Sequence, residues 1–282
     1  MKRLSILLFL GFIALHLMAQ AKYVFFFIGD GMGPHQVLAT EMYLAELDGK
    51  IGRKSLLMTT FPYSGQVATF STSNGITDSA ASGTCLASGE KTHNGVIGQK
   101  SDGTPAISVA TRLKEQGWGV GIMTSVTIDH ATPSAFYAHT PSRNNYYSIG
   151  TQLAKSNFDF FGGSGFYSPQ EKNDPTAPNL YDLCEQNGYV LAGGYAAAKA
   201  MHGAKKLLVV PAERLVDRSC HAGALPYAID RKEGELCLPE LVEVAIAHLQ
   251  THDKFFIMAE GGKIDYASHA NDGGTVLREV LD

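Results

Sequence analysis

The side chains with the clearest chemical potential lie in the ten-residue stretch EGGKIDYASH, residues 260–269. Glu260, Asp265 and His269 are all of metal-binding types, and Asp265 and His269 share one face of a helix because they are four residues apart. Two carboxylates and an imidazole form a donor set that suits zinc or magnesium. Since this set follows directly on an apolar run, it predicts a metal site.

A further carboxylate, Asp30, stands in the glycine-rich stretch GDGMG at 29–33. It also follows an apolar run, and the neighbouring glycines let the backbone and a ligand approach each other closely. Asp30 is therefore a candidate ligand for a divalent cation. The alternative is a helix N-cap, in which the side chain accepts hydrogen bonds from free backbone N–H groups. The segment alone leaves both roles open.

Ser79 is the candidate nucleophile, within TDSAASGT at 77–84. It begins a predicted helix of small residues, and a helix N-terminus offers free N–H groups and a positive dipole end to a phosphate. Small side chains also leave room for a ligand. Considered in isolation, the dipeptide Asp78-Ser79 is more typical of a simple N-cap.

The segment from Asp129 to Arg143 adds further polar candidates. His130 and Thr132 lie on one face if this segment is extended, because side chains alternate along a strand. Arg143 has the geometry to hold a phosphate through two parallel hydrogen bonds. A lone arginine in a loop is more commonly just solvated, so this assignment depends on the other segments.

The elements that position these residues alternate between strand and helix. The apolar run at 23–28 predicts a fully buried parallel strand that delivers Asp30 at its carboxyl end. Further strands are predicted at 119–123, 207–210 and 255–259, and helices at 33–46, 107–116, 196–200 and 239–249. This alternation predicts an α/β fold with a mostly parallel central sheet and helices on both faces. Such sheets carry their sites beyond the carboxyl ends of the strands. Residues 141–178 and 217–235, rich in Asn, Ser, Gly and Pro, are interpreted as surface insertions.

Composition and the N-terminus indicate where the protein works. The net charge is −4 and the sequence has no long basic run, so no nucleic-acid partner is expected. Residues 1–21 combine Lys2 and Arg3, an apolar stretch and an Ala-Gln-Ala site, which predicts a signal peptide cleaved near Ala21 and a secreted or periplasmic protein. The apolar stretch is short for the ~30 Å of a bilayer core, so a stable membrane anchor is not expected.

Export would allow the four cysteines to oxidise. Cys220 and Cys237 flank a loop-like stretch and form the expected disulfide pair. Cys85 lies in the helix beside Ser79 and is expected to be a buried thiol. The spacing of the cysteines matches no metal-binding pattern.

Four stretches together resemble the alkaline phosphatase family: GDGMG at 29–33, TDSAASGT at 77–84, ATPSAFYAHTPSR at 131–143 and EGGKIDYASH at 260–269. Their order and spacing also match, and the resemblance extends over nearly all of residues 23–282. It implies one alkaline phosphatase-like domain, residues 22–282, that hydrolyses small phosphate monoesters through a phosphoserine. The superfamily also contains sulfatases, but residue 79 has no Cys/Ser-x-Pro-x-Arg context.

The resemblance also implies residue roles and cofactors, two Zn²⁺ ions and one Mg²⁺ ion. Ser79 corresponds to the nucleophile and Arg143 to the phosphate clamp. The implied metal ligands are Asp30, Ser79, Thr132, Glu260, Asp265 and His269. His130 corresponds to a position that is Asp or His in the family. The resemblance implies that it either contacts a metal ligand without binding the metal itself, or binds the third metal ion of the site through water. A homodimer is compatible with the resemblance.

The sequence departs from the family after residue 269. The family has three further zinc ligands there, an Asp-His pair and a final His, and no residue matches them. The helix predicted from residue 275 runs to the last residue without a stop signal. The expectation is a C-terminally truncated domain that is inactive as it stands. Two alternatives stay open: a non-catalytic relic with a partial metal and phosphate site, and a phosphodiesterase or phosphonate hydrolase of the same superfamily.

Overall fold

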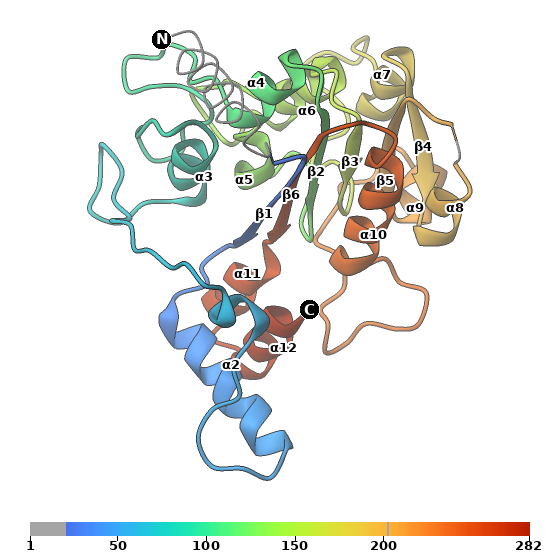
Figure 1. The fold of residues 1–282 in the computed structure, drawn as a ribbon. Coiled ribbons are helices and arrows are strands. Elements are labelled where there is room, and N and C mark those ends of the chain that lie inside the picture. Colours follow the sequence, from blue (N-terminus) through green and yellow to red (C-terminus); the bar gives the residue numbers. More distant parts are fainter. Residues whose placement is uncertain (1–20, 202) are drawn as a thin grey trace, which may run out of the picture.

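The computed structural model describes residues 21–201 and 203–282, and the predicted signal peptide lies outside this part except for Ala21. The described residues form one all-parallel, six-stranded sheet in the order β1-β6-β2-β3-β5-β4 (Figure 1). The strands are β1 Tyr23–Gly29, β2 Gly119–Thr124, β3 Phe160–Gly162, β4 Tyr189–Gly193, β5 Lys206–Val210 and β6 Phe255–Gly261. The predicted α/β fold with a parallel sheet is therefore confirmed.

Helices connect the strands as parallel pairing requires. They are α2 Pro34–Leu47, α3 Ser79–Ser88, α4 Val109–Glu115, α5 Ala131–Ser134, α6 Tyr146–Lys155, α7 Leu180–Gln186, α8 Tyr195–Lys199, α9 Ala212–Val216, α10 Leu238–Leu249, α11 Lys263–His269 and α12 Gly273–Leu281, with a 3₁₀ turn at Leu57–Thr60. No helix in the described ranges is both long and apolar enough to cross a membrane.

Successive side chains along the central strands enter two separate apolar clusters, one on each face of the sheet. Ile122 of β2 lies in the cluster that contains residues of α4 and α6, whereas the next residue, Met123, lies in the cluster that contains residues of α10. Both faces of β2 are thus buried, as expected for a central parallel strand.

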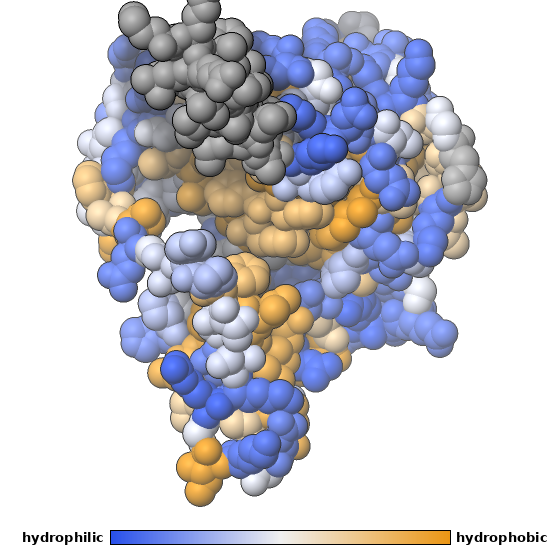
Figure 2. All heavy atoms as spheres, viewed as in Figure 1, coloured by the Kyte–Doolittle hydropathy of each residue, from blue (hydrophilic) through white to orange (hydrophobic). Residues whose placement is uncertain are grey.

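The prediction of a fully buried first strand is wrong. Tyr23, Phe25 and Phe27 are 55%, 42% and 63% exposed, because β1 is the edge strand and these side chains lie outside both clusters. The alternate residues, such as Phe26, pack against the core, whereas the exposed rings of Tyr23 and Phe25 lie against Phe255. Figure 2 shows apolar side chains gathered on this face, where β1 lies in Figure 1.

The interpretation of residues 141–178 as an insertion is also wrong. This stretch contains α6 and β3, and β3 pairs with β2 on one side and β5 on the other. Its strand is only three residues long, so it has no periodicity that a sequence pattern would reveal. The edge strand β4 was not predicted either. Residues 217–235 contain no helix or strand, in agreement with the prediction.

The predicted Cys220–Cys237 disulfide is not formed, since both are free thiols. Cys237 is the N-cap residue of α10, and its backbone N–H donates to Glu240 Oε2 at 3.2 Å. Cys220 is exposed near the start of the irregular stretch that leads to α10, where its Sγ lies 3.6 Å from Arg214 Nη1. Cys85, predicted to be a buried thiol, is only partly buried.

Candidate active site

The register of the sheet places the acidic segments side by side. β1 and β6 are parallel neighbours, with Ile28 opposite Glu260 and Gly29 opposite Gly261. Asp30 follows β1 directly, so its carboxylate and that of Glu260 lie at the same carboxyl edge of the sheet. On the other side of β6, Thr124 of β2 is opposite Glu260. Glu260 is thus flanked by Ile28 of β1 and Thr124 of β2, which are far from it in the sequence.

Ser79 faces Asp30 across this edge. Asp78 is the N-cap of α3, with its Oδ1 accepting from Ala81 N–H at 2.9 Å, so the capping interpretation holds for Asp78. Ser79 is the first residue of the helix, and its Oγ donates to Asp30 Oδ2 at 3.1 Å. The Asp-Ser dipeptide therefore divides two tasks, since one residue caps the helix and the other presents a hydroxyl.

Small residues in α3 allow close packing against α5. A Cβ atom at Gly83 would lie 3.3 Å from Thr132 Cα, so a larger residue would push the two helices apart. Gly31 is constrained similarly, because its φ is +66° and a Cβ there would lie 2.9 Å from Asp265 Oδ1. The GDG motif thus brings β1 close to the Asp265 carboxylate.

Three carboxylates share this region, and the pKa values of Glu260 and Asp30 are raised there. Burial raises the pKa of Glu260 to about 8, with the negative charge of Asp30 as the next cause. Burial and the charge of Asp265 raise the pKa of Asp30 to about 6. Glu260 Oε2 accepts from Thr124 Oγ1 at 2.5 Å, and the hydroxyl of Thr132 also bonds to Glu260. Its other oxygen, Oε1, is buried without any hydrogen-bond partner.

His269 lies at the outer side of this group. Its Nε2 is 3.5 Å from Asp265 Oδ1, and both residues lie on α11, as the four-residue spacing predicts. The His269 side chain is 81% exposed. In the described part of the chain, no three His, Cys, Asp or Glu side chains are gathered closely enough to hold a metal ion. The predicted donors are therefore neighbours, but they do not form a closed metal cage.

Arg143 is not a solvated surface arginine. Its Nη1 is 3.2 Å from Asp78 Oδ2, and its Nη2 is 3.2 Å from His130 Nε2. Burial, and next the positive charge of Arg143, lower the pKa of His130 to about 4. His130 is therefore neutral near pH 7, and its Nε2 accepts from the guanidinium. This pair of contacts holds Arg143 over the N-terminal turn of α3.

Other residues in the site were missed because only the fold reveals their roles. Asp78 links α3 to Arg143, and Thr124 binds Glu260. Lys263 is a buried cation that lies 3.1 Å from the equally buried Glu279 of α12, and it donates to Pro226 O at 2.6 Å. This pair fixes α11, which carries Asp265. The position of Lys263 in EGGK, three residues after Glu260, could have marked it as part of the site, but no sequence pattern indicates that it pairs with Glu279.

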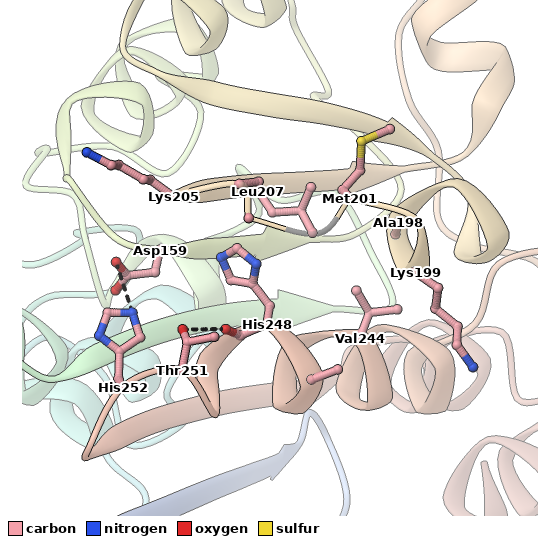
Figure 3. A pocket seen from close by; sticks show the side chains of 13 residues that line it. Asp159, Ala198, Lys199, Met201, Lys205, Leu207, Val244, His248, Thr251 and His252 are labelled. Carbon is pink, nitrogen blue, oxygen red and sulfur yellow. Dashed lines mark hydrogen bonds and ion pairs between the residues drawn. The ribbon is translucent and has the colours of Figure 1, made fainter.

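One large cavity lies away from these residues, so it is not the candidate site. It encloses about 630 Å³ between α8, α10 and the loop before β5, and none of the predicted site residues lines it. Its polar residues Asp159 and His252 precede β3 and β6, which places the cavity at the amino edge of the sheet. Figure 3 shows His252 and Asp159 pointing toward one another, with His252 Nε2 and Asp159 Oδ1 3.7 Å apart.

A serine at a helix start, an arginine above it and buried carboxylates at the carboxyl edge of a parallel sheet define a class of site suited to phosphate and divalent cations. The family described as "Alkaline phosphatase" matches residues 21–159 and 220–282. The chain therefore belongs to the alkaline phosphatase family.

Individual relatives support this assignment. The chain is 29% identical to the tissue-nonspecific alkaline phosphatase of Gallus gallus, with 93% of the chain and 59% of the relative covered. It is 31% identical to alkaline phosphatase 4 of Bacillus subtilis, with 94% and 56% covered. The chain thus spans less than two thirds of the length of these curated relatives.

Solved structures agree with the fold. The alkaline phosphatase of the Antarctic bacterium TAB5 has a TM-score of 0.79 at 26% identity, over 93% of this chain and 72% of that one. The Thermus thermophilus alkaline phosphatase has a TM-score of 0.79 at 29% identity, over 94% and 55%. A mutant of the TAB5 enzyme, 25% identical to this chain with 92% and 70% covered and a TM-score of 0.78, was solved with magnesium bound in its M3 site. The family therefore uses metal ions.

Proposed function

We propose that this protein hydrolyses phosphate monoesters through a phosphoserine on Ser79. The observation that carries the proposal is the contact of Ser79 Oγ with Asp30 Oδ2 at 3.1 Å, at the first residue of α3 and beside the Asp78–Arg143 pair. One hydroxyl thus has an acceptor for its proton, a helix N-terminus behind it and a cation next to it. These are the three requirements of a nucleophile that attacks an anionic phosphate.

Each residue has a defined task in the proposed reaction. Asp30 Oδ2 orients the Ser79 hydroxyl and accepts its hydrogen bond, so that Oγ points at phosphorus. The Oγ–P bond forms while the Ser79 proton passes to Asp30 Oδ2 and the bond from phosphorus to the leaving oxygen breaks, and the leaving oxygen then receives that proton through water and departs as the alcohol. Arg143 holds the non-bridging oxygens. Water then hydrolyses the phosphoserine and returns the proton to Ser79.

The carboxylate group fits a bound cation. Glu260 Oε1 is buried without a partner, and burial, followed by the charge of a neighbouring carboxylate, raises the pKa values of Glu260 and Asp30. We propose two Zn²⁺ and one Mg²⁺ ion, with Thr132, Glu260 and Asp30 at the magnesium and with Asp30, Ser79, Asp265 and His269 divided between the zincs. When bound, these ions supply charge neutralisation and Lewis-acid stabilisation of the transferring phosphoryl group.

Turnover of this chain by itself is proposed to be low. Each proposed zinc has two ligands here, Asp30 with Ser79 and Asp265 with His269, which is fewer than the three or four that hold zinc firmly. The non-catalytic alternative of the sequence analysis predicts the same low turnover but no phosphoserine. The test is to incubate residues 22–282 with zinc, magnesium and an aryl phosphate, quench in acid and identify the phosphorylated residue by mass spectrometry. Phosphate found on Ser79 supports the proposal, and its absence under all metal conditions rejects it.

Replacing Arg143 with Ala is expected to weaken inorganic phosphate binding by roughly 10- to 100-fold, because a charge-assisted bidentate contact contributes about 1.5–3 kcal/mol. The measurement is calorimetric titration with phosphate. Arg112→Ala is the matched control, since Arg112 is an exposed arginine at the end of α4. Equal phosphate affinity in the Arg143 and Arg112 variants would contradict the clamp assignment.

We also propose that the protein is exported, as the pattern of residues 1–21 suggests. The mature chain is then expected to begin at Lys22. N-terminal sequencing of the protein recovered from outside the cytoplasm checks this, and a retained Met1 would contradict it.

A further inference from the structure

A second cavity, of about 450 Å³, lies beside the clamp and has no role in the proposed chemistry. It is bordered by Asn144 and Asn145, which follow Arg143 directly, and by Tyr146 at the start of α6. Tyr167 and Gln170, in the loop after β3, also line it. The cavity is therefore at the carboxyl edge of the sheet, on the same edge as Ser79.

The dipeptide Asp129-His130 contacts both the Arg143 clamp and Tyr167 of the cavity lining. His130 Nε2 lies 3.2 Å from Arg143 Nη2. The neighbouring residue, Asp129, is fully buried, and its two carboxylate oxygens accept from the backbone N–H of Tyr167 at 2.9 and 3.0 Å. The position of Tyr167 is thus fixed relative to Arg143 through its backbone and does not depend on its own side chain.

The walls of the cavity carry an aromatic surface that is open to solvent. The rings of Tyr146 and Tyr167 pack with their centroids 4.4 Å apart, and the ring of His221 lies 5.6 Å from that of Tyr167. Tyr167 is nevertheless 45% exposed. A tyrosine that is almost half exposed and held by its backbone offers accessible aromatic surface against which another planar ring can pack.

The polar groups of the cavity favour an uncharged ligand that forms hydrogen bonds. Asn144, Asn145 and Gln170 carry side-chain amides, which both donate and accept. The charged lining residues, Glu171 and Lys172, have opposite signs and cancel. A second phosphate therefore finds no net positive charge here, whereas amides match the mixed donor and acceptor edges of a nucleobase.

We propose that this cavity binds the nucleobase of a nucleoside monophosphate whose phosphate lies at Arg143 and Ser79. The position of the phosphate group in this inference rests on the proposed function. Tyr146 lies three positions after Arg143, a span of at most ~11 Å between their Cα atoms, so a ribose is a spacer of suitable length between the two subsites. The base stacks on the Tyr146–Tyr167 surface, and the amides contact its edge.

The test compares four probes on the whole chain by calorimetry and ligand-observed NMR: adenosine, inorganic phosphate, glycerol phosphate and adenosine monophosphate. Adenosine monophosphate is expected to bind about tenfold more tightly than phosphate or glycerol phosphate. Tyr167→Leu and Tyr146→Leu remove this advantage and keep phosphate affinity. Tyr167→Phe keeps it, because the ring is retained. Tyr63→Leu is the control, since Tyr63 is 92% exposed and lies outside the cavity.

The outcomes separate this inference from the proposed function. Equal affinities for adenosine monophosphate and glycerol phosphate in the wild type would overturn the inference, as would an advantage that persists in both leucine variants. Adenosine binding that depends on Tyr167 supports the inference by itself. If adenosine binds in this way and phosphate does not, the cavity assignment stands and the proposed function fails. Arg143→Ala is expected to weaken both phosphate esters and leave adenosine unchanged.

Discussion

Replacing Ser79 with Ala is expected to abolish the phosphoserine and, in a protein whose zinc sites are complete, to reduce monoester hydrolysis by roughly 10⁴- to 10⁶-fold, the size of loss seen when a serine nucleophile is removed. The reason is specific to one atom. Ser79 Oγ is the hydroxyl that contacts Asp30, and the rest of the helix start is held by Asp78, whose cap to Ala81 N–H does not involve Ser79. Alanine also suits a first helical position, so the fold is retained.

Ser88→Ala provides the matched control for this prediction. Ser88 lies at the other end of α3, and its Oγ donates to Thr84 O at 2.7 Å, away from the carboxylates. Both variants are compared by acid-quench labelling, turnover and thermal unfolding. A Ser79→Ala protein that still forms a phosphoenzyme would show that another residue is the nucleophile. An equal loss in Ser88→Ala would show that the effect is structural.

The second prediction concerns Glu260 and the metal-free protein, which is expected to lose stability as the pH rises from about 4 to 8. The folded-state pKa of Glu260 is raised from its ordinary value of 4.5 to about 8, and that of Asp30 from 3.8 to about 6. A carboxyl group whose pKa is raised in the folded state contributes its full stabilisation at pH values below its pKa in the unfolded state. This contribution is lost as the pH rises through its pKa in the folded state. For Glu260 alone the loss is at most about 5 kcal/mol, at about 1.4 kcal/mol per pH unit.

A divalent cation is expected to reverse this loss. Magnesium binds the ionised carboxylates and displaces the proton, so its stabilising effect is larger at pH 8 than at pH 5. The measurement is the melting temperature across this pH range, with chelator and then with magnesium. Glu260→Gln flattens the metal-free profile, whereas the control Glu233→Gln, at an exposed position, leaves it unchanged. A wild-type profile without pH dependence, or no added effect of magnesium at high pH, would contradict the proposed cation site.

The central strands could be predicted because each is a short apolar run beside a helix signal. β2, β5 and β6 lie close to the predicted ranges, and the polar segments that follow β1, β2 and β6 meet at one edge because all strands are parallel. The spacing of Asp265 and His269 correctly indicated one helical face. These features are local or follow from parallel topology, so a single sequence contains them.

Other features depended on which elements become neighbours. The YVFFFI run is typical of a buried strand, yet β1 is an edge strand, since only the sheet order decides which faces are covered. β3 is too short to be recognised and still occupies the middle of the sheet. The two cysteines flank a loop in sequence, but Cys237 belongs to α10 and Cys220 does not approach it.

The sequence by itself determined the residue types at the strand ends, the start of α3 at Ser79 and the helical spacing of α11, because caps, apolar runs and helical periods are local properties. Only the tertiary structure decided the partners: Thr124 at Glu260, Asp78 and His130 at Arg143, and Asp129 at Tyr167. These contacts join residues 13 to 136 positions apart. The strength of these contacts depends on burial and on neighbouring charges, and both arise only when the chain has folded.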